Sequence, residues 1–148
     1  MKYRKGIFAV VYTKNQINGK VEYLILKRKK HWNGWEFVKG KIENFEMKGV
    51  AARRETIEET GQKILKIKKF NVKGSYKYNK ILKDRPGLIG QTYHLFAIEV
   101  EKGKVKLDKI EHSDYKWVGF KEAMKKLTWK NQQECLKKVN NWLVKKKE

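Results

Sequence analysis

Three glutamates in the segment RRETIEET, namely Glu55, Glu58 and Glu59, have a spacing that could hold a divalent cation. If the segment is helical, at about 100° per residue, these side chains share an arc roughly 100° wide. Carboxylates so close together repel one another and destabilise a helix unless a cation offsets the repulsion. A divalent ion with oxygen ligands is the natural candidate, and the alternative is a solvated helix that carries Arg–Glu pairs.

The residues around these glutamates predict the helix that would carry them. The apolar spacing indicates a helix from about Met47 to Thr60, and Gly61 is suited to end it in a left-handed turn. Arg54 and Glu58 fall within the expected apolar stripe, whose members are Met47, Val50, Ala51 and Ile57. We expect this stripe to pack against the rest of the fold.

The stretch from Gly40 to Gln62 resembles the Nudix box, G-x5-E-x7-R-E-U-x-E-E-x-G-U, in which U is an aliphatic residue. All the fixed positions of that motif match, and they are Gly40, Glu46, Arg54, Glu55, Glu58, Glu59 and Gly61. The two aliphatic positions differ, because Thr56 and Gln62 stand there. We expect Thr56 to be a mild change and Gln62 to loosen the packing after the helix.

The resemblance implies a site for Mg²⁺, with Mn²⁺ as a second option, and it implies the residues that hold the ion. These metal ligands are Glu55, Glu58, Glu59 and the carbonyl of Gly40. Arg54 would orient a carboxylate, and Glu46 would have a structural role. The general base varies within the family, so Glu55 and the later Glu111 are both candidates, of which we favour Glu111. No Cys/His set with zinc spacing competes for a metal.

Two further stretches resemble one subgroup of the family, the asymmetrical diadenosine tetraphosphate hydrolases. The sequence HWNGWEFVKGKIE resembles their W-x-F-P-K-G-H-x-E, and IEHSDYKWVGFKEA resembles their E-H-x3-Y-x-W-L-x3-E-A. Lys39 fits this subgroup, since many other Nudix proteins have Gly there. Val38 replaces the usual Pro, and Asn44-Phe45 replaces the usual Pro-Gly.

The same resemblance suggests residues that would bind a substrate. Tyr76 stands roughly where the subgroup places a tyrosine that stacks on adenine, although it could instead pack on the edge of a strand. Lys39, together with Lys77, Lys80 and Lys83, could hold phosphates. Trp32 and Trp35 lie in an otherwise polar loop, where they either plug the end of a sheet or line a cleft for a base.

The remaining pattern indicates an α/β fold. Strands are predicted at 6–12, 21–27, 64–78, 91–100 and 114–120, the first two as a hairpin, and helical spacing runs from 123 to 143. The strand at 64–78 alternates apolar and basic residues, so one of its faces is strongly cationic. We expect a mixed β-sheet between helices, as in the α/β/α sandwich of Nudix proteins, and a single Nudix domain over residues 1–148.

The amino-acid composition limits the class of protein and the kind of binding partner. The chain has 148 residues, 37 Lys and Arg against 16 Asp and Glu, and a formal charge of +21, which attracts polyanions. Such Lys-rich usage could also reflect an AT-rich genome or a hot habitat. The lone Cys135 excludes an internal disulfide and favours a cytoplasmic protein. No apolar run is long enough for a membrane span, and we expect a monomer or a weak homodimer.

Three functions remain open. The first is Mg²⁺-dependent hydrolysis of dinucleoside polyphosphates, with diadenosine tetraphosphate cleaved to ATP and AMP. The second is the same chemistry on RNA 5′-triphosphates or caps, or on oxidised nucleoside triphosphates, and the net charge favours RNA as a partner. The third is a non-catalytic RNA-binding protein. The complete glutamate set argues against the third, since binding alone needs no carboxylate cluster among so many lysines.

Overall fold

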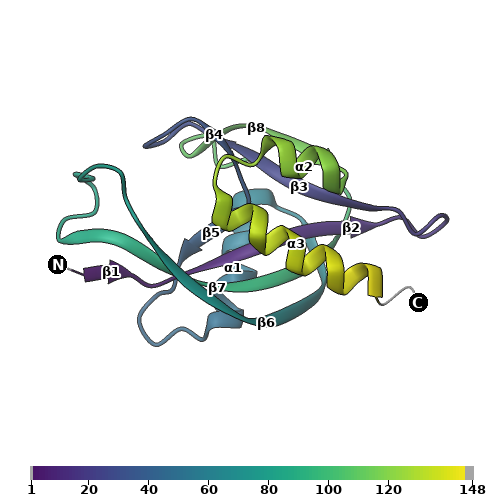
Figure 1. Ribbon diagram of the computed structural model, residues 1–148, viewed down its shortest axis with the longest axis horizontal. Coiled ribbons are helices and arrows are strands. Elements are labelled where there is room, and N and C mark those ends of the chain that lie inside the picture. Colours follow the sequence, from purple (N-terminus) through teal and green to yellow (C-terminus); the bar gives the residue numbers. More distant parts are fainter. Residues whose placement is uncertain (1, 146–148) are drawn as a thin grey trace.

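A mixed sheet of eight strands forms the centre of the molecule (Figure 1). The computed structural model describes residues 2–145. The strands are β1 (Lys2–Arg4), β2 (Gly6–Lys14), β3 (Val21–Arg28), β4 (Gly34–Glu36), β5 (Val38–Lys41), β6 (Lys63–Lys77), β7 (Leu88–Glu101) and β8 (His112–Val118). The sheet order is β1-β7-β2-β3-β4, with β5 paired to β2, β6 to β7 and β8 to β3. β7 runs parallel to β1 and β2, and the other pairs are antiparallel.

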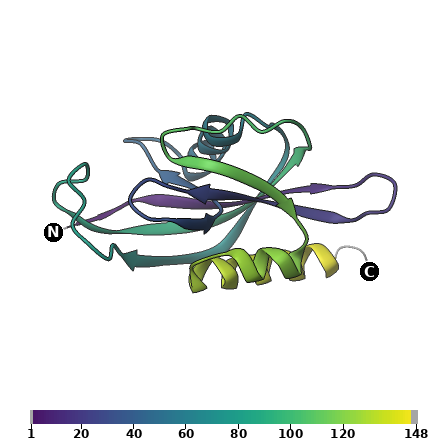
Figure 2. The ribbon, with the colours of Figure 1, turned by 90° about the horizontal axis from the view of Figure 1, so that it is seen from above.

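Helices cover both faces of this sheet. Figure 2 shows α1 (Lys48–Thr60) above the sheet and α3 (Lys130–Lys145) below it. The short helix α2 (Phe120–Lys126) joins β8 to α3 and packs on the same core as α3. This arrangement confirms the expected α/β/α sandwich with a mixed sheet. Among residues 2–145, no helix is long and apolar enough to cross a membrane.

The sequence of β2 explains why both faces are covered. The strand is apolar at nearly every position, and the side chains of residues 7–12 are buried. Alternate residues belong to two separate cores: Ile7, Ala9 and Val11 on the side of α1, and Phe8, Val10 and Tyr12 on the side of α3. A strand that is buried on both faces has no polar alternation, and this is the pattern that the sequence has.

The buried face of α1 differs from the one that we predicted. The exposed fractions of Met47, Val50 and Ile57 are 75%, 53% and 48%, so most of the predicted apolar stripe faces outward. The residues of α1 that are buried are Ala51, Ala52, Thr56, Glu59 and Thr60. These side chains are mostly small, and small side chains let a helix lie close to a sheet. The close approach of α1 is what brings a glutamate of this face into the interior.

The two departures from the aliphatic positions of the motif are both accommodated by hydrogen bonds. The buried Thr56 hydroxyl donates to the carbonyl of Ala52 at 2.8 Å. The expectation that Gln62 loosens the packing is wrong, because this residue is buried and bonded on both sides. Its Nε2 donates to the carbonyl of Lys104 at 2.9 Å, and its Oε1 accepts the backbone N–H of Gly103 at 3.0 Å. Gln62 therefore fixes the loop after β7 to the end of α1.

The helix itself begins and ends close to the predicted positions. Met47 is the residue before its first turn, and Gly61 ends it with a φ of 66° and a backbone N–H that donates to the carbonyl of Ile57. Only glycine adopts this left-handed conformation at no steric cost. All five predicted strands are present, whereas the short strands β4 and β5 lie in the stretch that we took as a loop leading into the motif.

Candidate active site

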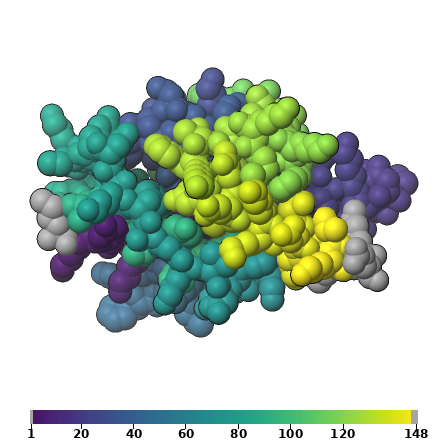
Figure 3. Space-filling view, viewed as in Figure 1, coloured from purple at the N-terminus to yellow at the C-terminus, as the bar shows by residue number. Residues whose placement is uncertain are grey.

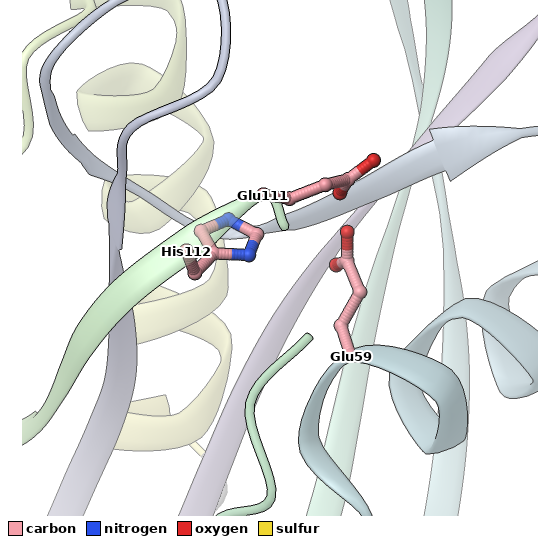
Figure 4. A group of neighbouring side chains, drawn as sticks. All are labelled: Glu59, Glu111 and His112. Carbon is pink, nitrogen blue, oxygen red and sulfur yellow. The ribbon is translucent and has the colours of Figure 1, made fainter. Parts of the chain in front are cut away.

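Carboxylates from α1 and from the loop before β8 meet in one small cavity. This cavity has a volume of about 130 Å³, and its acidic lining consists of Glu55, Glu58, Glu59, Asp108 and Glu111. Figure 4 shows Glu59 extending from α1 toward the carboxylate of Glu111, with His112 beside it at the start of β8. One ligand atom from each of Glu59, Glu111 and His112 lies within 4.8 Å of the others. The structure thus brings Glu111 close to the glutamates of α1, a position that its predicted role as the general base requires.

The environments of Glu55 and Glu59 disfavour the ionised forms of these two carboxylates. Burial, and then the neighbouring carboxylate of Glu111, raise the pKa of Glu59 well above its usual value. Burial also raises the pKa of Glu55 to about 7, even though Arg54 works in the opposite direction. An acidic group in an apolar surrounding beside a second acid binds a proton tightly unless another cation takes its place.

The donor set fits a hard divalent cation. Glu59 is 3% exposed, and its Oε2 is buried without a hydrogen-bond partner. The cavity combines this oxygen with the carboxylates of Glu55, Glu58 and Glu111, and Gly40 also lines it. Mg²⁺ and Mn²⁺ prefer carboxylate, carbonyl and water oxygens. Glu55, Glu58, Glu59 and Gly40 are therefore placed together, as the resemblance implied.

Gly40 allows α1 to approach β5 at the cavity. A Cβ atom at this position would lie 2.0 Å from Cδ of Glu55, a distance that no real side chain tolerates. The glycine thus leaves room for the Glu55 side chain, which would have to move if position 40 carried a Cβ atom. This contact explains why the first residue of the motif and a glutamate 15 positions later belong to one site.

Arg54 holds three glutamates in place. Its Nε and Nη2 donate to the carboxylate of Glu46 at 2.8 and 2.9 Å, and these bonds lower the pKa of Glu46 to about 2. Its Nη1 donates to Glu55 at 2.9 Å and to Glu58 at 3.2 Å. Nη2 also donates to the carbonyl of Lys41 at 2.7 Å. Arg54 therefore contacts the carboxylates rather than the open part of the cavity.

A buried network of charges lies beneath the cavity. The carboxylate of Glu36 is inaccessible, and it lies 3.1 Å from Lys39 Nζ, 2.7 Å from His112 Nε2 and 3.3 Å from Arg28 Nη1. Burial by itself would raise the pKa of Glu36, but Lys39, His112 and Arg28 outweigh it and lower the pKa to about 2. Arg28 lies 3.5 Å from Glu111 in turn. Glu36 thereby connects Lys39 to Glu111 through ion pairs.

A second, larger cavity of about 380 Å³ has a lining that includes the aromatic side chains of Phe8, Trp32, Tyr76, Tyr78 and Trp129. Trp32 and Trp129 meet edge to face with centroids 5.1 Å apart, and Tyr76 and Tyr78 meet in the same way at 6.2 Å. Lys39 Nζ lies 5.4 Å from the ring centroids of both Trp32 and Tyr76. In Figure 3 a hollow separates the teal β6–β7 turn from the start of α3. Flat rings around such a space are suited to stack on a base.

The two cavities adjoin and share three cationic residues. Arg28, Lys39 and Arg85 line both the carboxylate cavity and the aromatic cavity. The two cavities, which we call the cleft when taken together, thus have aromatic rings in one part, carboxylates in the other and positive charge in the lining that they share. A ligand with a base and a chain of phosphates has the same order of groups.

The cleft contains most of the residues that we predicted for substrate binding. Lys39, Tyr76 and Trp32 line the aromatic cavity, whereas Trp35 packs against the core on the side of α3. Lys83 is exposed and is not among the described residues that line either cavity. Two residues further along the same turn, Arg85 takes the place that we had expected for a lysine.

Several lining residues were not anticipated from the sequence. Tyr78, Arg85 and Trp129 come from the β6–β7 turn and from the residue before α3. Glu36 and His112 form the buried network, and their only signals in the sequence are a carboxylate inside the aromatic run WEF and a histidine next to Glu111. Such residues are joined by tertiary contacts, which local spacing does not encode.

Comparisons with known proteins agree with this geometry. A family model described as the NUDIX domain matches residues 2–139. A candidate Nudix hydrolase from Listeria monocytogenes is similar in structure, with a TM-score of 0.78 and 22% identity, covering 99% of this chain and 97% of that chain. A search of curated protein sequences found no significant match.

Two further solved structures of named enzymes are similar over nearly their whole length. The Ap4A hydrolase of C. elegans, in a binary complex, has a TM-score of 0.70 and 25% identity, covering 95% of this chain and 98% of that chain. The dihydroneopterin triphosphate pyrophosphohydrolase of E. coli has a TM-score of 0.72 and 19% identity, covering 93% of this chain and 97% of that chain.

Proposed function

The chain belongs to the Nudix family, and from this premise we propose that it is a Mg²⁺-dependent hydrolase of dinucleoside polyphosphates that cleaves diadenosine tetraphosphate to ATP and AMP. The observation that carries the proposal is that the aromatic cavity and the carboxylate cavity adjoin and share the cationic residues Arg28, Lys39 and Arg85. The likeness to a C. elegans Ap4A hydrolase at 25% identity supports the same substrate class.

In such a reaction, different residues of the cleft would bind the metal ion, accept a proton and stack on the base. When bound, Mg²⁺ would neutralise charge on phosphate oxygens and lower the pKa of the attacking water. Glu55, Glu58, Glu59 and Gly40 would hold the ion, and Glu111 would accept the proton of the water. The adenine base stacks among the aromatic rings, an interaction worth roughly 1–3 kcal/mol for bases on aromatic side chains.

The order of groups along the cleft favours asymmetric cleavage. A base held by Trp32 and Tyr76 places the first phosphates against Lys39 and Arg85, so the carboxylate cavity reaches only a short part of a chain of four phosphates. A chain held by one end is off-centre relative to the carboxylates. Water should therefore attack on one side of the midpoint.

A panel of substrates with chromatographic separation of the products tests this proposal. The purified protein with Mg²⁺ is given dinucleoside polyphosphates, nucleoside triphosphates and 5′-triphosphate RNA. We expect diadenosine tetraphosphate to be the best substrate and to yield equal amounts of ATP and AMP. Two molecules of ADP from each tetraphosphate would contradict the off-centre geometry, and an inert tetraphosphate would exclude the substrate class.

A second candidate substrate is RNA with a 5′-triphosphate, and one feature of the surface favours it. β6 carries a row of exposed lysines whose last member lines the aromatic cavity, and its members are Lys63, Lys66, Lys68, Lys69, Lys73 and Lys77. The prediction of a single cationic face is wrong, because Ile64 and Ile67 pack on the side of α1 whereas Phe70 and Val72 pack on the side of α3, so both faces carry lysines. Such a row could follow a phosphate backbone that leaves the cleft. Release of pyrophosphate from 5′-triphosphate RNA, with no cleavage of the dinucleotide, would favour this candidate.

A further inference from the structure

The carboxylate cavity has a wall of hydrogen-bond donors, of which the reaction described above uses only one, Arg85. Arg4 is the last residue of β1, and Gln91 lies opposite it in β7. Arg85 follows in the turn between β6 and β7. All three residues line the cavity together with Glu55 and Gly40. Each side chain offers N–H donors, and the two guanidinium groups have no acceptor atom at all.

Two of these donors are buried without a partner. Gln91 is 2% exposed, and within the described residues 2–145 its Nε2 has no hydrogen-bond acceptor. The buried Nε of Arg4 also lacks one. A buried donor without an acceptor loses the hydrogen bonds that it makes to water, so such groups are rare away from binding sites. Two unpaired N–H donors on one wall of the cavity indicate a space that fits a bound hydrogen-bond acceptor.

The positive charges on this wall lack a carboxylate partner among the described residues, although Arg85 Nη1 donates to the hydroxyl of Tyr78 at 2.9 Å. Among residues 2–145, neither Arg4 nor Arg85 forms an ion pair with a carboxylate. Burial, and then the positive charge of Arg85, lower the pKa of Arg4. Two guanidinium groups that repel each other across an open space are stabilised by an anion between them. The missing group is therefore an acceptor that carries negative charge.

A glycine places the amide of Gln91 beside the metal end of the cavity. A Cβ atom at Gly6 would lie 2.4 Å from Nε2 of Gln91 and 2.7 Å from the carbonyl oxygen of Gly40. Any other residue at position 6 would push the amide away. The unpaired Nε2 of Gln91 is consequently near the carbonyl of Gly40, which we assign to the metal site. An anion bound to this Nε2 would therefore adjoin the metal.

We propose that Arg4, Arg85 and Gln91 form a subsite for one phosphate group of the substrate, adjacent to the phosphate held by the metal. The inference rests on the proposed function for its substrate, a chain of phosphates. The chemistry recognised is a tetrahedral phosphoryl group with several acceptor oxygens, which two guanidinium groups and one amide can bind at once. Because this subsite is one phosphate away from the metal, it would help to select polyphosphates over monophosphates.

Methylenediphosphonate tests the subsite without any turnover, because its P–C–P link cannot be hydrolysed. Calorimetry in excess Mg²⁺ compares the wild type with Arg4→Gln, Arg85→Gln and Gln91→Glu. The matched control is Arg53→Gln, which removes the same charge from an exposed position on α1. We expect each of the three variants to lose affinity by about tenfold or more, as for a hydrogen bond to a charged group, and the control to bind like the wild type.

Gln91→Glu separates a binding role from a structural one. The new carboxylate would offset one of the two positive charges of Arg4 and Arg85, so this variant should melt at or above the temperature of the wild type while it binds the anion poorly. Equal affinity in the control and all three variants, or an absence of binding to the wild type, would overturn the subsite. Loss of binding in the variants, with no cleavage of any dinucleoside polyphosphate by the wild type, would leave the subsite standing and exclude the proposed function.

Discussion

The buried carboxylate of Glu59 lies close to the partly exposed carboxylate of Glu111, and two negative charges so near each other are unfavourable unless a cation lies between them. A proton and a divalent metal ion compete for that position. Protonation removes one charge, whereas a hard cation keeps both carboxylates ionised and satisfies their oxygens. The affinity for metal at this site should therefore rise with pH, and the free protein should hold a proton where the active enzyme holds an ion.

Replacing two helix glutamates tests the metal site directly. Glu58→Gln combined with Glu59→Gln keeps the size of both side chains but removes two charged ligands. We expect turnover to fall by about a hundredfold or more, with the fold retained, because charge on the transferred phosphate is no longer neutralised. The matched control is Glu101→Gln with Glu122→Gln, two exposed glutamates outside the cavity. Full turnover in the folded cavity variant, measured by product chromatography, would exclude the assignment.

The identity of the general base can be read from kinetic constants. If Glu111 accepts the proton of the water, Glu111→Gln should lower kcat by about 10²–10⁴-fold, with little change in KM. Calorimetry with Mg²⁺ serves as the check, because loss of a metal ligand would also lower the affinity for the ion. A larger fall in kcat for Glu55→Gln, at unchanged metal affinity, would assign the base to α1 instead.

The raised pKa of Glu55 predicts how the metal-free protein responds to pH. Burial raises this pKa from 4.5 to about 7, so the folded state holds the proton more tightly than the unfolded chain does. The free energy of unfolding should therefore fall as pH rises from about 4.5 to about 7, by about 1–3 kcal/mol from this group. Urea denaturation in EDTA measures the fall. The difference between the wild type and Glu55→Gln isolates the contribution, and identical slopes for the two proteins would contradict it.

At the scale of elements, local patterns predicted the strands well and the packed face of α1 badly. β2, β6 and β7 were found because runs of apolar residues or strict alternation indicate strands by their period. The face of α1 was assigned by apolarity, yet Ala52, Thr56 and Glu59 are buried while Met47 is exposed. The need for close contact with the sheet outweighed hydrophobicity, and a single sequence does not reveal that need.

The residues of the candidate site also divide into those that local spacing predicted and those that it did not. The spacing of glutamates within α1 predicted a shared cluster, since three and four residues make one helical turn. The position of Glu111 beside Glu59 came from the family resemblance, because the two are far apart along the chain. Arg85 and Trp129 were not predicted, since each reaches the cleft from a turn whose path is set by tertiary packing.

The contact between β5 and α1 gives a test with a clean control. Gly40→Ala places a Cβ atom where Cδ of Glu55 lies 2.0 Å away, so the glutamate must move. We expect turnover to fall by about a hundredfold and the free energy of unfolding by about 1–3 kcal/mol. Gly119→Ala is the control, because nothing lies within 4 Å of the position that its Cβ atom would take. Equal turnover and equal melting temperature in the two variants would show that the close approach does not matter.

The charge of the whole molecule acts over longer distances than any of these contacts. A formal charge of +21 surrounds a cleft that is itself cationic in the middle, so an incoming polyanion is attracted from every side. The lysine row on β6 is part of this field. It also blocks the free edge of the sheet against pairing with another strand, as charged residues on edge strands commonly do. Long-range attraction and a binding path for RNA can be told apart. The attraction depends on the number of charges, whereas a binding path depends on where the lysines lie.

Two sets of lysine substitutions separate the field from a binding path. One triple variant changes Lys66, Lys69 and Lys73 of β6 to Gln, and the other changes the exposed Lys20, Lys121 and Lys125. For diadenosine tetraphosphate we expect kcat/KM to fall about equally in both, with kcat unchanged. The fall should disappear at high salt, because screening over roughly 10 Å at 0.1 M ionic strength removes long-range attraction. A loss confined to the β6 variant and seen only with RNA would instead mark β6 as a path for a nucleic acid strand, in favour of the second candidate.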